Sequence, residues 1–281
     1  MSIVTLTTDF GLRDAYVGAM KGVILSIAPA ATLVDLSHDI APQSIAEAAF
    51  IVYSAYRYFP PDTVHLVVVD PGVGTARRPL ALRTRRGLFV APDNGVLGYV
   101  LDREPEWTAA HLREERFWLR ETSHTFHGRD IFAPVAAHLA AGAPLEALGP
   151  QVYDPVQRPF PRLIRCGERR VQAQVVYVDR FGNAITNLAG EEQIAGRPAA
   201  QWRGHLTARL AAGTVAGIQT TYGEAAAGAF LLLVGSSGFV EIACREGHAA
   251  GALGIRIGDP VHFEVESQPA IGGIESHPTD R

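Results

Sequence analysis

Apolar and polar positions divide the chain into two halves with different patterns. In residues 1–150, short apolar runs alternate with stretches whose apolar positions recur every three or four residues. The runs at 3–8, 63–69 and 87–91 are typical of buried strands, and the periodic stretches are typical of helices. This alternation predicts an amino-terminal α/β sandwich domain.

Local signals indicate where several of these elements begin and turn. Asp14 precedes a stretch with apolar residues on one face, so we expect it to cap that helix. Ser44 and Glu47 have the spacing of a capping box ahead of a second helix. The strands expected at 79–84 and 87–91 are close enough to pair as a hairpin.

The pattern changes after a proline-rich connection at residues 151–169, which we expect to join two domains. Beyond it, short apolar segments are separated by glycine and polar turns, with little helical periodicity: 170–178, 184–188, 205–210, 230–234, 239–243 and 261–265. These segments predict a smaller carboxy-terminal all-β, barrel-like domain at 170–267. Residues 268–281 lack a core pattern and are expected to fray.

Acidic residues stand where two of the amino-terminal strands should end. Asp9 follows the first strand, and Asp70 begins the segment Asp-Pro-Gly-Val-Gly-Thr-Ala-Arg that ends at Arg77. A third polar segment, residues 123–130, precedes a helix-like run. Ligands of open α/β sheets bind at the carboxyl ends of strands, so these segments are candidates for a site. A simple turn would also account for the Asp, Pro and Gly residues.

Composition narrows the class of protein. The chain has 281 residues, 47% of them hydrophobic and 19% charged, which is typical of a globular protein. A net charge of −4 offers no electrostatic footprint for nucleic acid. The two cysteines lie far apart, and no apolar run is long enough for a membrane span. We therefore expect a cytoplasmic enzyme or binding protein, without nucleic-acid or membrane partners.

Six motifs in order resemble one family closely. They are Thr7-Thr-Asp-Phe-Gly11 with Asp14–Gly22, Asp70–Gly74 with Arg77, Pro92–Gly95, His127–Asp130, Asp179–Asn183, and Gly235–Gly238 with Glu241–Ala243. The family is that of the S-adenosyl-L-methionine (SAM) hydrolases, or SAM hydroxide adenosyltransferases, relatives of the fluorinating and chlorinating adenosyl enzymes. The resemblance covers roughly residues 3 to 265, and the combination of motifs is highly specific.

The resemblance implies that Asp70, Arg77 and His127 activate a water molecule for attack on C5′ of SAM. The sulfonium leaves as a neutral thioether and needs no general acid, whereas water must be deprotonated or polarised. Arginine and the substrate's own cation would stabilise the developing hydroxide. By residue type alone Arg78 would serve as well, and only the family spacing selects Arg77.

Two alternatives concern the same residues. The spacing of His124, His127 and Asp130 would allow a metal site on a helix, but Gly128 favours a loop and no further ligand is evident, so neither a metal nor a cofactor is expected. The halide-using relatives carry aromatic residues at the positions of Asp70 and His127 and an extra loop, and the fluorinating enzyme has a serine at that of Gly128. This difference favours hydrolysis over halide transfer.

The resemblance also implies the substrate contacts and the assembly. Ribose hydroxyls would bind Asp9, whose carboxylate can accept from a vicinal diol. Adenine would pack on aromatic rings and the methionine part would bind mainly the carboxy-terminal domain; the remaining implied binding residues are Asp14, Phe126, Asp179, Asn183, Tyr222, Ser236 and Ser237. The family suggests a homotrimer with each pocket shared between subunits.

Two other functions remain open at this point. A non-catalytic sensor of adenosine or SAM would keep the same binding residues. A phosphate-releasing nucleotide hydrolase would need an anion cradle, but the Asp70 segment lacks the Gly-Lys-Ser/Thr of a P-loop, and Pro71 removes an N–H group.

Overall fold

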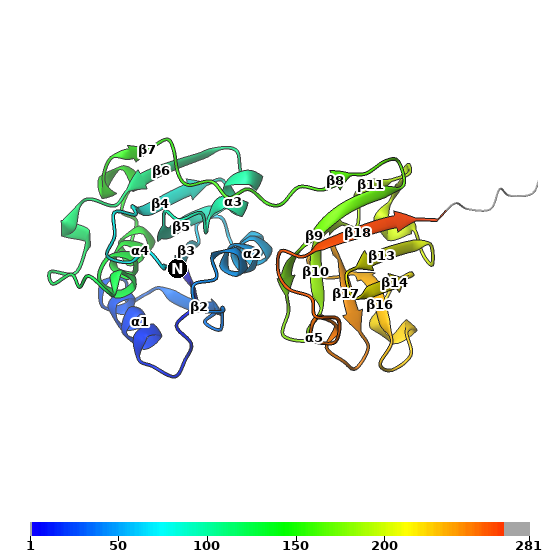
Figure 1. Ribbon diagram of the computed structural model, residues 1–281. Helices are drawn as coiled ribbons and strands as arrows, with labels where there is room; N and C mark the ends of the chain where they lie inside the picture. Colours follow the sequence, from blue (N-terminus) through cyan, green and yellow to red (C-terminus); the bar gives the residue numbers. More distant parts are fainter. Residues whose placement is uncertain (1, 267–281) are drawn as a thin grey trace, which may run out of the picture. The chain divides into compact units, whose positions relative to one another are not determined.

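The computed structural model describes residues 2–266, and it divides into two compact units on either side of the Phe160–Pro161 bond (Figure 1). The tail expected to fray, 268–281, lies outside the described residues. Each unit has its own sheet and its own hydrophobic core, so each is described separately.

A seven-stranded sheet forms the centre of the amino-terminal unit, in the order β2-β1-β3-β5-β4-β6-β7. The first four strands in this order run parallel, and β4, β6 and β7 are added by antiparallel pairing. Pairing of Thr84 with Gly87 confirms the predicted hairpin. The strands are β1 Ile3–Thr8, β2 Thr32–Ser37, β3 Val64–Val68, β4 Pro79–Thr84, β5 Gly87–Pro92, β6 Trp107–His111 and β7 Gln151–Val152.

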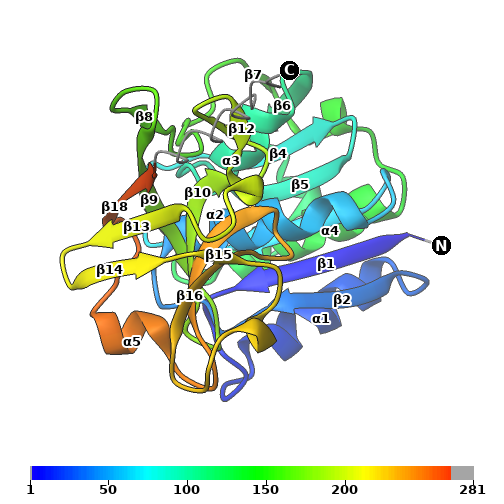
Figure 2. The ribbon, with the colours of Figure 1, turned by 90° about the vertical axis from the view of Figure 1, so that its right-hand side faces the viewer.

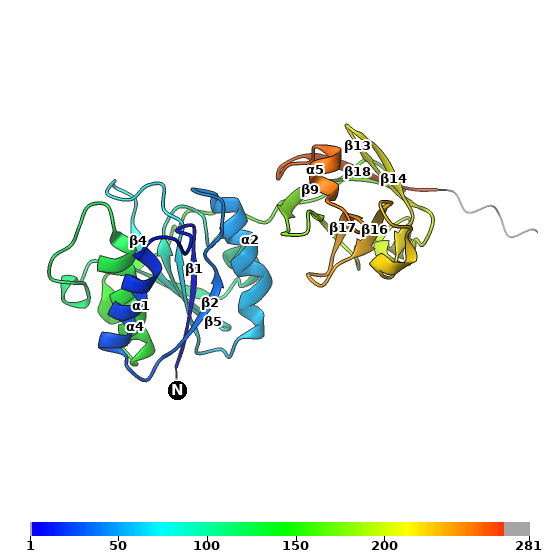
Figure 3. The same cartoon turned by 90° about the horizontal axis from the view of Figure 1, so that it is seen from below.

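Helices cover both faces of this sheet, which confirms the predicted α/β sandwich. They are α1 Tyr16–Ile27, α2 Ile45–Ala55, α3 Gly98–Arg103 and α4 Ala133–Ala140. Seen from below, α1 and α4 lie on one side of the sheet and α2 on the other (Figure 3). Successive residues of β3 alternate accordingly: Leu66 and Val68 pack with α1 and α4, and Val67 packs with α2 and α3.

The two predicted helix caps are not formed. Asp14 is exposed, and α1 begins at Tyr16 with Ala15 at the N-cap and no side-chain cap. Ser44 does occupy the N-cap of α2, but its side chain makes no capping hydrogen bond. Glu47, the acid of the expected capping box, instead accepts the backbone N–H of Ala41 at 3.1 Å and so holds the segment that leads into α2.

The carboxy-terminal unit is built on a nine-stranded sheet with the path β14-β13-β18-β9-β10-β17-β16-β15, to which β8 adds beside β9 (Figure 2). The two ends of this path are consecutive in the chain, because only Gly217 separates β14 from β15, so the sheet is nearly closed. This arrangement confirms the predicted barrel-like class. The strands are β8 Ile164–Arg165, β9 Arg170–Val178, β10 Ala184–Ala189, β13 Leu206–Leu210, β14 Gly213–Ala216, β15 Ile218–Gln219, β16 Phe230–Val234, β17 Phe239–Cys244 and β18 Pro260–Val265.

Two small elements accompany this sheet. A short helix, α5 Ala249–Leu253, was not predicted, and β11 Gln193–Ile194 and β12 Arg197–Pro198 form a separate hairpin. Across residues 2–266, none of the helices has both the length and the apolar character needed to cross a membrane.

Part of the proline-rich connection packs on the amino-terminal unit. Arg158 lies so close to Gly95 and Gly98 that a Cβ at either glycine would come within 2.5 Å of it. Phe160 stacks on Tyr53, with ring centroids 5.2 Å apart. Residues 151–160 therefore belong physically to the first unit.

Candidate active site

The expected strand-end acids lie at one edge of the amino-terminal sheet. Strands β1 and β3 are parallel neighbours, with Thr8 opposite Val68. Asp9 follows β1 directly, and Asp70 comes two residues after β3. Because both strands end at the same edge, the two carboxylates belong to adjacent loops there, as the sequence predicts.

Hydrogen bonds join the three predicted catalytic side chains. Arg77 Nε donates to Asp70 Oδ1 at 2.9 Å and to Oδ2 at 3.0 Å, and Arg77 Nη2 donates to Oδ2 at 2.5 Å. The same Nη2 lies 2.8 Å from His127 Nδ1. The side chains of Asp70 and Arg77 are only 5% and 9% exposed, and the guanidinium lies 5.1 Å from the centre of the Phe132 ring. The structure thus brings these three residues together as one connected group.

The loop that carries Asp70 and Arg77 is fastened at both ends by consecutive residues after β5. Asn94 Nδ2 donates to the carbonyl of Val69, just before the loop, at 2.9 Å. The backbone N–H of Asp93 donates to the carbonyl of Arg78, just after the loop, also at 2.9 Å. These bonds tie the loop to the central sheet.

Gly74 allows this loop to meet the segment that carries His127. Its φ of +75° is a conformation that favours glycine, and a Cβ there would lie 2.5 Å from the carbonyl oxygen of His124. The second segment is held in turn by Asp130, which is fully buried, accepts the N–H of Ser123 at 2.8 Å and pairs with Arg129. Close backbone contact therefore sets the distance between Arg77 and His127.

Contacts separate Arg77 from its neighbour in the sequence. Arg78 donates to Asp93 Oδ2 at 2.7 Å and to Asp154 Oδ1 at 2.8 Å. It therefore pairs with residues outside the Asp70 group, and it supports the end of the loop. The choice of Arg77, which the sequence made only through the resemblance, agrees with this geometry.

The protonation pattern of His127 follows from its partner. An arginine side chain is a hydrogen-bond donor only, so His127 Nδ1 must accept from Arg77, which leaves the proton of the neutral ring on Nε2. Burial and the cation of Arg77 lower the pKa of His127, although Asp70 and Asp130 act in the opposite direction. The imidazole is therefore neutral near pH 7, with an N–H group available to orient a bound oxygen.

The contacts of Asp130 disfavour the alternative metal site at His124, His127 and Asp130. Asp130 is engaged by Arg129 and by the N–H of Ser123, with no exposed surface. Within residues 2–266, no three His, Cys, Asp or Glu side chains are grouped as a metal ion would require.

Asp9 is held by one oxygen. Its Oδ2 accepts the N–H of Gln43 at 2.8 Å, and Oδ1 has no hydrogen-bond partner among the described residues. Asp14, five residues later, is exposed. Phe126 packs in a cluster with Phe10 and Tyr16, at centroid distances of 5.8 and 5.1 Å. The half-buried carboxylate and the aromatic cluster are suited to a ribose and a flat base.

The carboxy-terminal unit contains a second polar group. Asp179 accepts from the N–H of Asn183 at 2.8 Å and from its Nδ2 at 2.9 Å. Asn183 Nδ2 lies 3.4 Å from the hydroxyl of Tyr222, which donates to Glu241. Three of these four residues were predicted to bind substrate. Glu241 was not among the predicted substrate-binding residues, although it lies in one of the motifs shared with the family and stands within the apolar strand β17.

Glu241 is an unusual carboxyl group. It is 3% exposed, and burial raises its pKa; the hydrogen bond from Tyr222 opposes this rise and the charge of Asp179 adds to it. The predicted Ser236 is exposed, whereas the hydroxyl of Ser237 is buried and has no hydrogen-bond partner among the described residues. The turn that carries both serines approaches Glu241 closely at Gly235.

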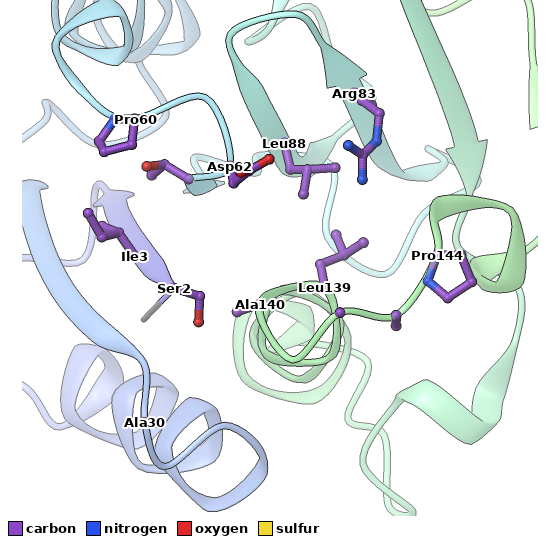
Figure 4. Close-up of a pocket in the computed structure, with 13 residues that line it drawn as sticks. Ser2, Ile3, Ala30, Pro60, Asp62, Arg83, Leu88, Leu139, Ala140 and Pro144 are labelled. Carbon is purple, nitrogen blue, oxygen red and sulfur yellow. The ribbon is translucent and has the colours of Figure 1, made fainter.

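A cavity of about 800 Å³ lies elsewhere in the amino-terminal unit (Figure 4). Its walls include Ile3 at the start of β1, Thr63 just before β3 and Leu88 in β5. These positions mark the amino ends of the parallel strands, which is the edge opposite to Asp9 and Asp70. The cavity is therefore separate from the candidate site.

Comparison with known protein families assigns both units. Residues 4–149 match the model of the SAM hydroxide adenosyltransferase N-terminal domain, and residues 173–262 match that of the C-terminal domain. The chain belongs to the SAM hydroxide adenosyltransferase family. The family resemblance noted in the sequence is thereby confirmed.

Curated members of the SAM hydroxide adenosyltransferase family are similar over most of this chain. The (R)-S-adenosyl-L-methionine hydrolase of Thermus thermophilus is 39% identical, covering 94% of this chain and 100% of that protein. The protein of the same name from Salinispora tropica is 40% identical over 91% and 95%. A fluorinase of Actinoplanes is less similar, at 29% identity over 66% of this chain and 71% of the enzyme.

Solved structures agree with this assignment. An uncharacterized conserved protein from Thermotoga maritima has a TM-score of 0.86 and 34% identity, covering 94% of this chain and 99% of that one. A conserved hypothetical protein from Thermus thermophilus has a TM-score of 0.76 and 36% identity, with 94% and 100% coverage.

Proposed function

We propose that this enzyme hydrolyses S-adenosyl-L-methionine to adenosine and L-methionine. The observation that carries the proposal is the hydrogen-bonded group of Asp70, Arg77 and His127 at the carboxyl edge of the sheet. Similarity to (R)-S-adenosyl-L-methionine hydrolases over more than nine-tenths of the chain supports it. By the same likeness, the substrate is the (R)-sulfonium.

The reaction is a displacement at C5′ of the ribose. The oxygen of a water molecule forms a bond to C5′ while the C5′–S bond breaks, and its electron pair stays on sulfur as the neutral thioether of methionine. The water proton passes to Asp70, whose carboxylate retains lone pairs beyond those that Arg77 occupies. The N–H at His127 Nε2 orients the water oxygen, and the fixed cation of Arg77 stabilises the developing hydroxide.

Both the Asp70 carboxylate and the His127 imidazole are groups that could accept the water proton. Since Nδ1 of His127 is occupied by Arg77, its ring is arranged as a donor in this state. The base is therefore Asp70. SAM is the substrate of this reaction, and no cofactor or metal takes part in it.

Substrate recognition uses the groups of both units. Asp9 Oδ1 accepts a ribose hydroxyl, and Phe126 packs on adenine. Asp179, Asn183, Ser236 and Ser237 bind the methionine part, and Tyr222 packs beside the adenine. Asp14, which is exposed, is a further contact with the substrate. We also propose that the enzyme is a cytoplasmic homotrimer in which each site draws residues from two subunits.

The decisive experiment is incubation of the protein with SAM, followed by chromatography for adenosine and methionine. Formation of both products in equal amounts supports hydrolysis, and a halogenated adenosine would indicate halide transfer instead. Binding of SAM without turnover would establish the sensor. Asp70→Asn should retain ligand binding and lose product formation.

Subunit exchange tests the shared site. Asp70→Ala and Asn183→Ala proteins should each be inactive, and mixing them should restore activity because some sites would then contain both native residues. Continued inactivity after demonstrated exchange would place each site within one chain.

A further inference from the structure

The loop that contains Asp9 is held by a buried histidine on the neighbouring strand. His38 follows β2 and is 5% exposed, while Thr8, the last residue of β1, has no exposed surface. Thr8 Oγ1 and His38 Nδ1 are 2.8 Å apart. The backbone carbonyl of His38 also accepts the N–H of Gly11 at 2.8 Å, so His38 contacts the chain on both sides of Asp9.

Thr8 transmits this contact to Asp9 through a local turn. Its Oγ1 accepts the backbone N–H of Phe10 at 3.3 Å, which closes a small turn with Asp9 at its centre. The rotamer of Thr8 therefore determines where the backbone of Asp9 lies. A bond from His38 to Oγ1 fixes that rotamer.

A carboxylate and an ammonium group lie behind the imidazole. Asp35 Oδ1 lies 3.0 Å from His38 Nε2, at ion-pair distance but with the N–H direction bent away from the oxygen. Asp35 Oδ2 accepts from Lys21 of α1 at 2.6 Å. Partial burial raises the pKa of Asp35, but the hydrogen bond from Lys21 and the nearby His38 ring outweigh this effect, and the pKa is lowered. Asp35 is thus ionised at neutral pH.

The ionised carboxylate sets the direction of every bond in the series. A carboxylate accepts only, so Nε2 of His38 carries the ring proton toward Asp35. In the neutral ring Nδ1 is then an acceptor, and the hydroxyl of Thr8 donates to it. The lone pair of Thr8 Oγ1 remains for the N–H of Phe10. The hydroxyl of Thr8 then serves both His38 and Phe10, whereas His38 Nε2 keeps only its electrostatic contact with Asp35.

We infer that His38 is a positioning residue for ribose recognition, acting on Asp9 through the hydroxyl of Thr8. The inference rests on the proposed function, in which Asp9 binds the ribose diol. Asp9 Oδ2 is already held by Gln43, so the direction of the remaining oxygen depends on the turn that His38 fixes. The ribose hydroxyls do not react, so their loss weakens binding in the ground state and the transition state alike.

Two substitutions of His38 separate this role from simple filling of space. In His38→Asn, an amide oxygen can replace Nδ1 and accept from Thr8, while the contact to Asp35 is lost. In His38→Gln, the longer amide can reach Asp35 in place of Nε2, while the contact to Thr8 is lost. Thr8→Val removes the hydroxyl from the other side with little change in shape.

The measurement is the affinity for adenosine and for 2′-deoxyadenosine by calorimetry. The wild-type protein should prefer adenosine by about tenfold or more, because a charged acceptor loses a partner in the deoxy compound. His38→Asn should retain this preference, whereas His38→Gln and Thr8→Val should bind the two nucleosides nearly equally. With SAM, the two latter variants should show a raised KM and a kcat within about threefold of wild type.

The outcomes distinguish failure of the proposed SAM hydrolysis from failure of the positioning role of His38. If the wild-type protein neither hydrolyses SAM nor binds either nucleoside, the proposed function fails and the inference fails with it. If it hydrolyses SAM but shows no preference for adenosine, only the inference fails. If the wild-type protein discriminates and His38→Gln discriminates equally, only the positioning role is wrong. Equal damage in His38→Asn and His38→Gln would likewise show that His38 only fills space.

Discussion

Replacing Arg77 with lysine tests the centre of the candidate site. Lysine keeps the positive charge, but its single ammonium cannot reproduce a planar fork that contacts two residues at once. Arg77 holds Asp70 through Nε and Nη2 and reaches His127 through Nη2. The substitution therefore isolates geometry from charge.

The expected magnitude follows from these contacts. A hydrogen bond to a charged group contributes about 1.5–3 kcal/mol, and here the side chains are almost completely buried, so solvent screening is small. Loss of the bond to His127 and of one bond to Asp70 should cost about 3 kcal/mol in transition-state stabilisation. This corresponds to a fall of roughly 100-fold in kcat/KM.

The assay is adenosine release from SAM by wild type, Arg77→Lys and the matched control Arg78→Lys. Arg78 is the same residue type one position along, but it binds Asp93 and Asp154, so its variant should remain within about threefold of wild type. Nitrogen NMR of His127 should show the proton on Nε2 in the wild-type protein. An Arg77→Lys enzyme with wild-type kcat/KM, or equal losses in both variants, would refute the reasoning.

Three further predictions concern stability, each measured by denaturant unfolding. Gly74→Ala should lower the free energy of unfolding by about 1–2 kcal/mol or more and also lower kcat, because its Cβ would lie 2.5 Å from a carbonyl oxygen. The control Gly142→Ala has a φ of +96° and nothing within 4 Å of its Cβ, so it should show only the backbone strain and leave kcat unchanged. Burial lowers the pKa of His65 to about 4, so below pH 6.5 the unfolded chain binds a proton at His65 that the folded protein does not bind. The free energy of unfolding should therefore fall by about 3 kcal/mol as the pH decreases from 6.5 to 4. The double variant Thr5→Val/His65→Phe, which removes both hydrogen-bonding partners, should show no such pH dependence. An unchanged slope of unfolding free energy against pH would contradict the assignment to His65. Ser44→Ala should cost less than about 0.5 kcal/mol, since the side chain makes no cap, and the usual loss of about 1 kcal/mol would show that it does.

The sequence predicts the amino-terminal architecture well because its signals there are local. A buried strand, a turn and an acid occur within ten residues around Asp70, and parallel pairing with β1 places Asp9 beside it. The helix caps were wrong for a physical reason. Asp14 and Ser44 have suitable side chains, but a cap depends on the path by which the chain enters the helix, and this path is set by contacts such as that of Glu47 with Ala41.

The sequence could not distinguish between similar neighbouring residues where the difference lies in contacts with distant parts of the chain. Nothing local distinguishes Arg77 from Arg78, and the difference lies in partners such as Asp154, which is 76 residues away in the chain. Glu241 lies in a family motif but was not predicted to bind substrate, because the hydrogen bond that it accepts from Tyr222, 19 residues away in the chain, cannot be seen in the sequence. The roles of the binding residues and the trimer remain predictions.

The two fastenings of the Asp70 loop have a consequence for how the enzyme meets its substrate. Asn94 and Asp93 hold the loop to strands that cannot shift without disturbing the central sheet. Both ends of the loop are therefore fixed to the central sheet. Asp70 and Arg77 are already paired in the folded chain, so the entropy of bringing these two groups together is lost during folding and not in each turnover.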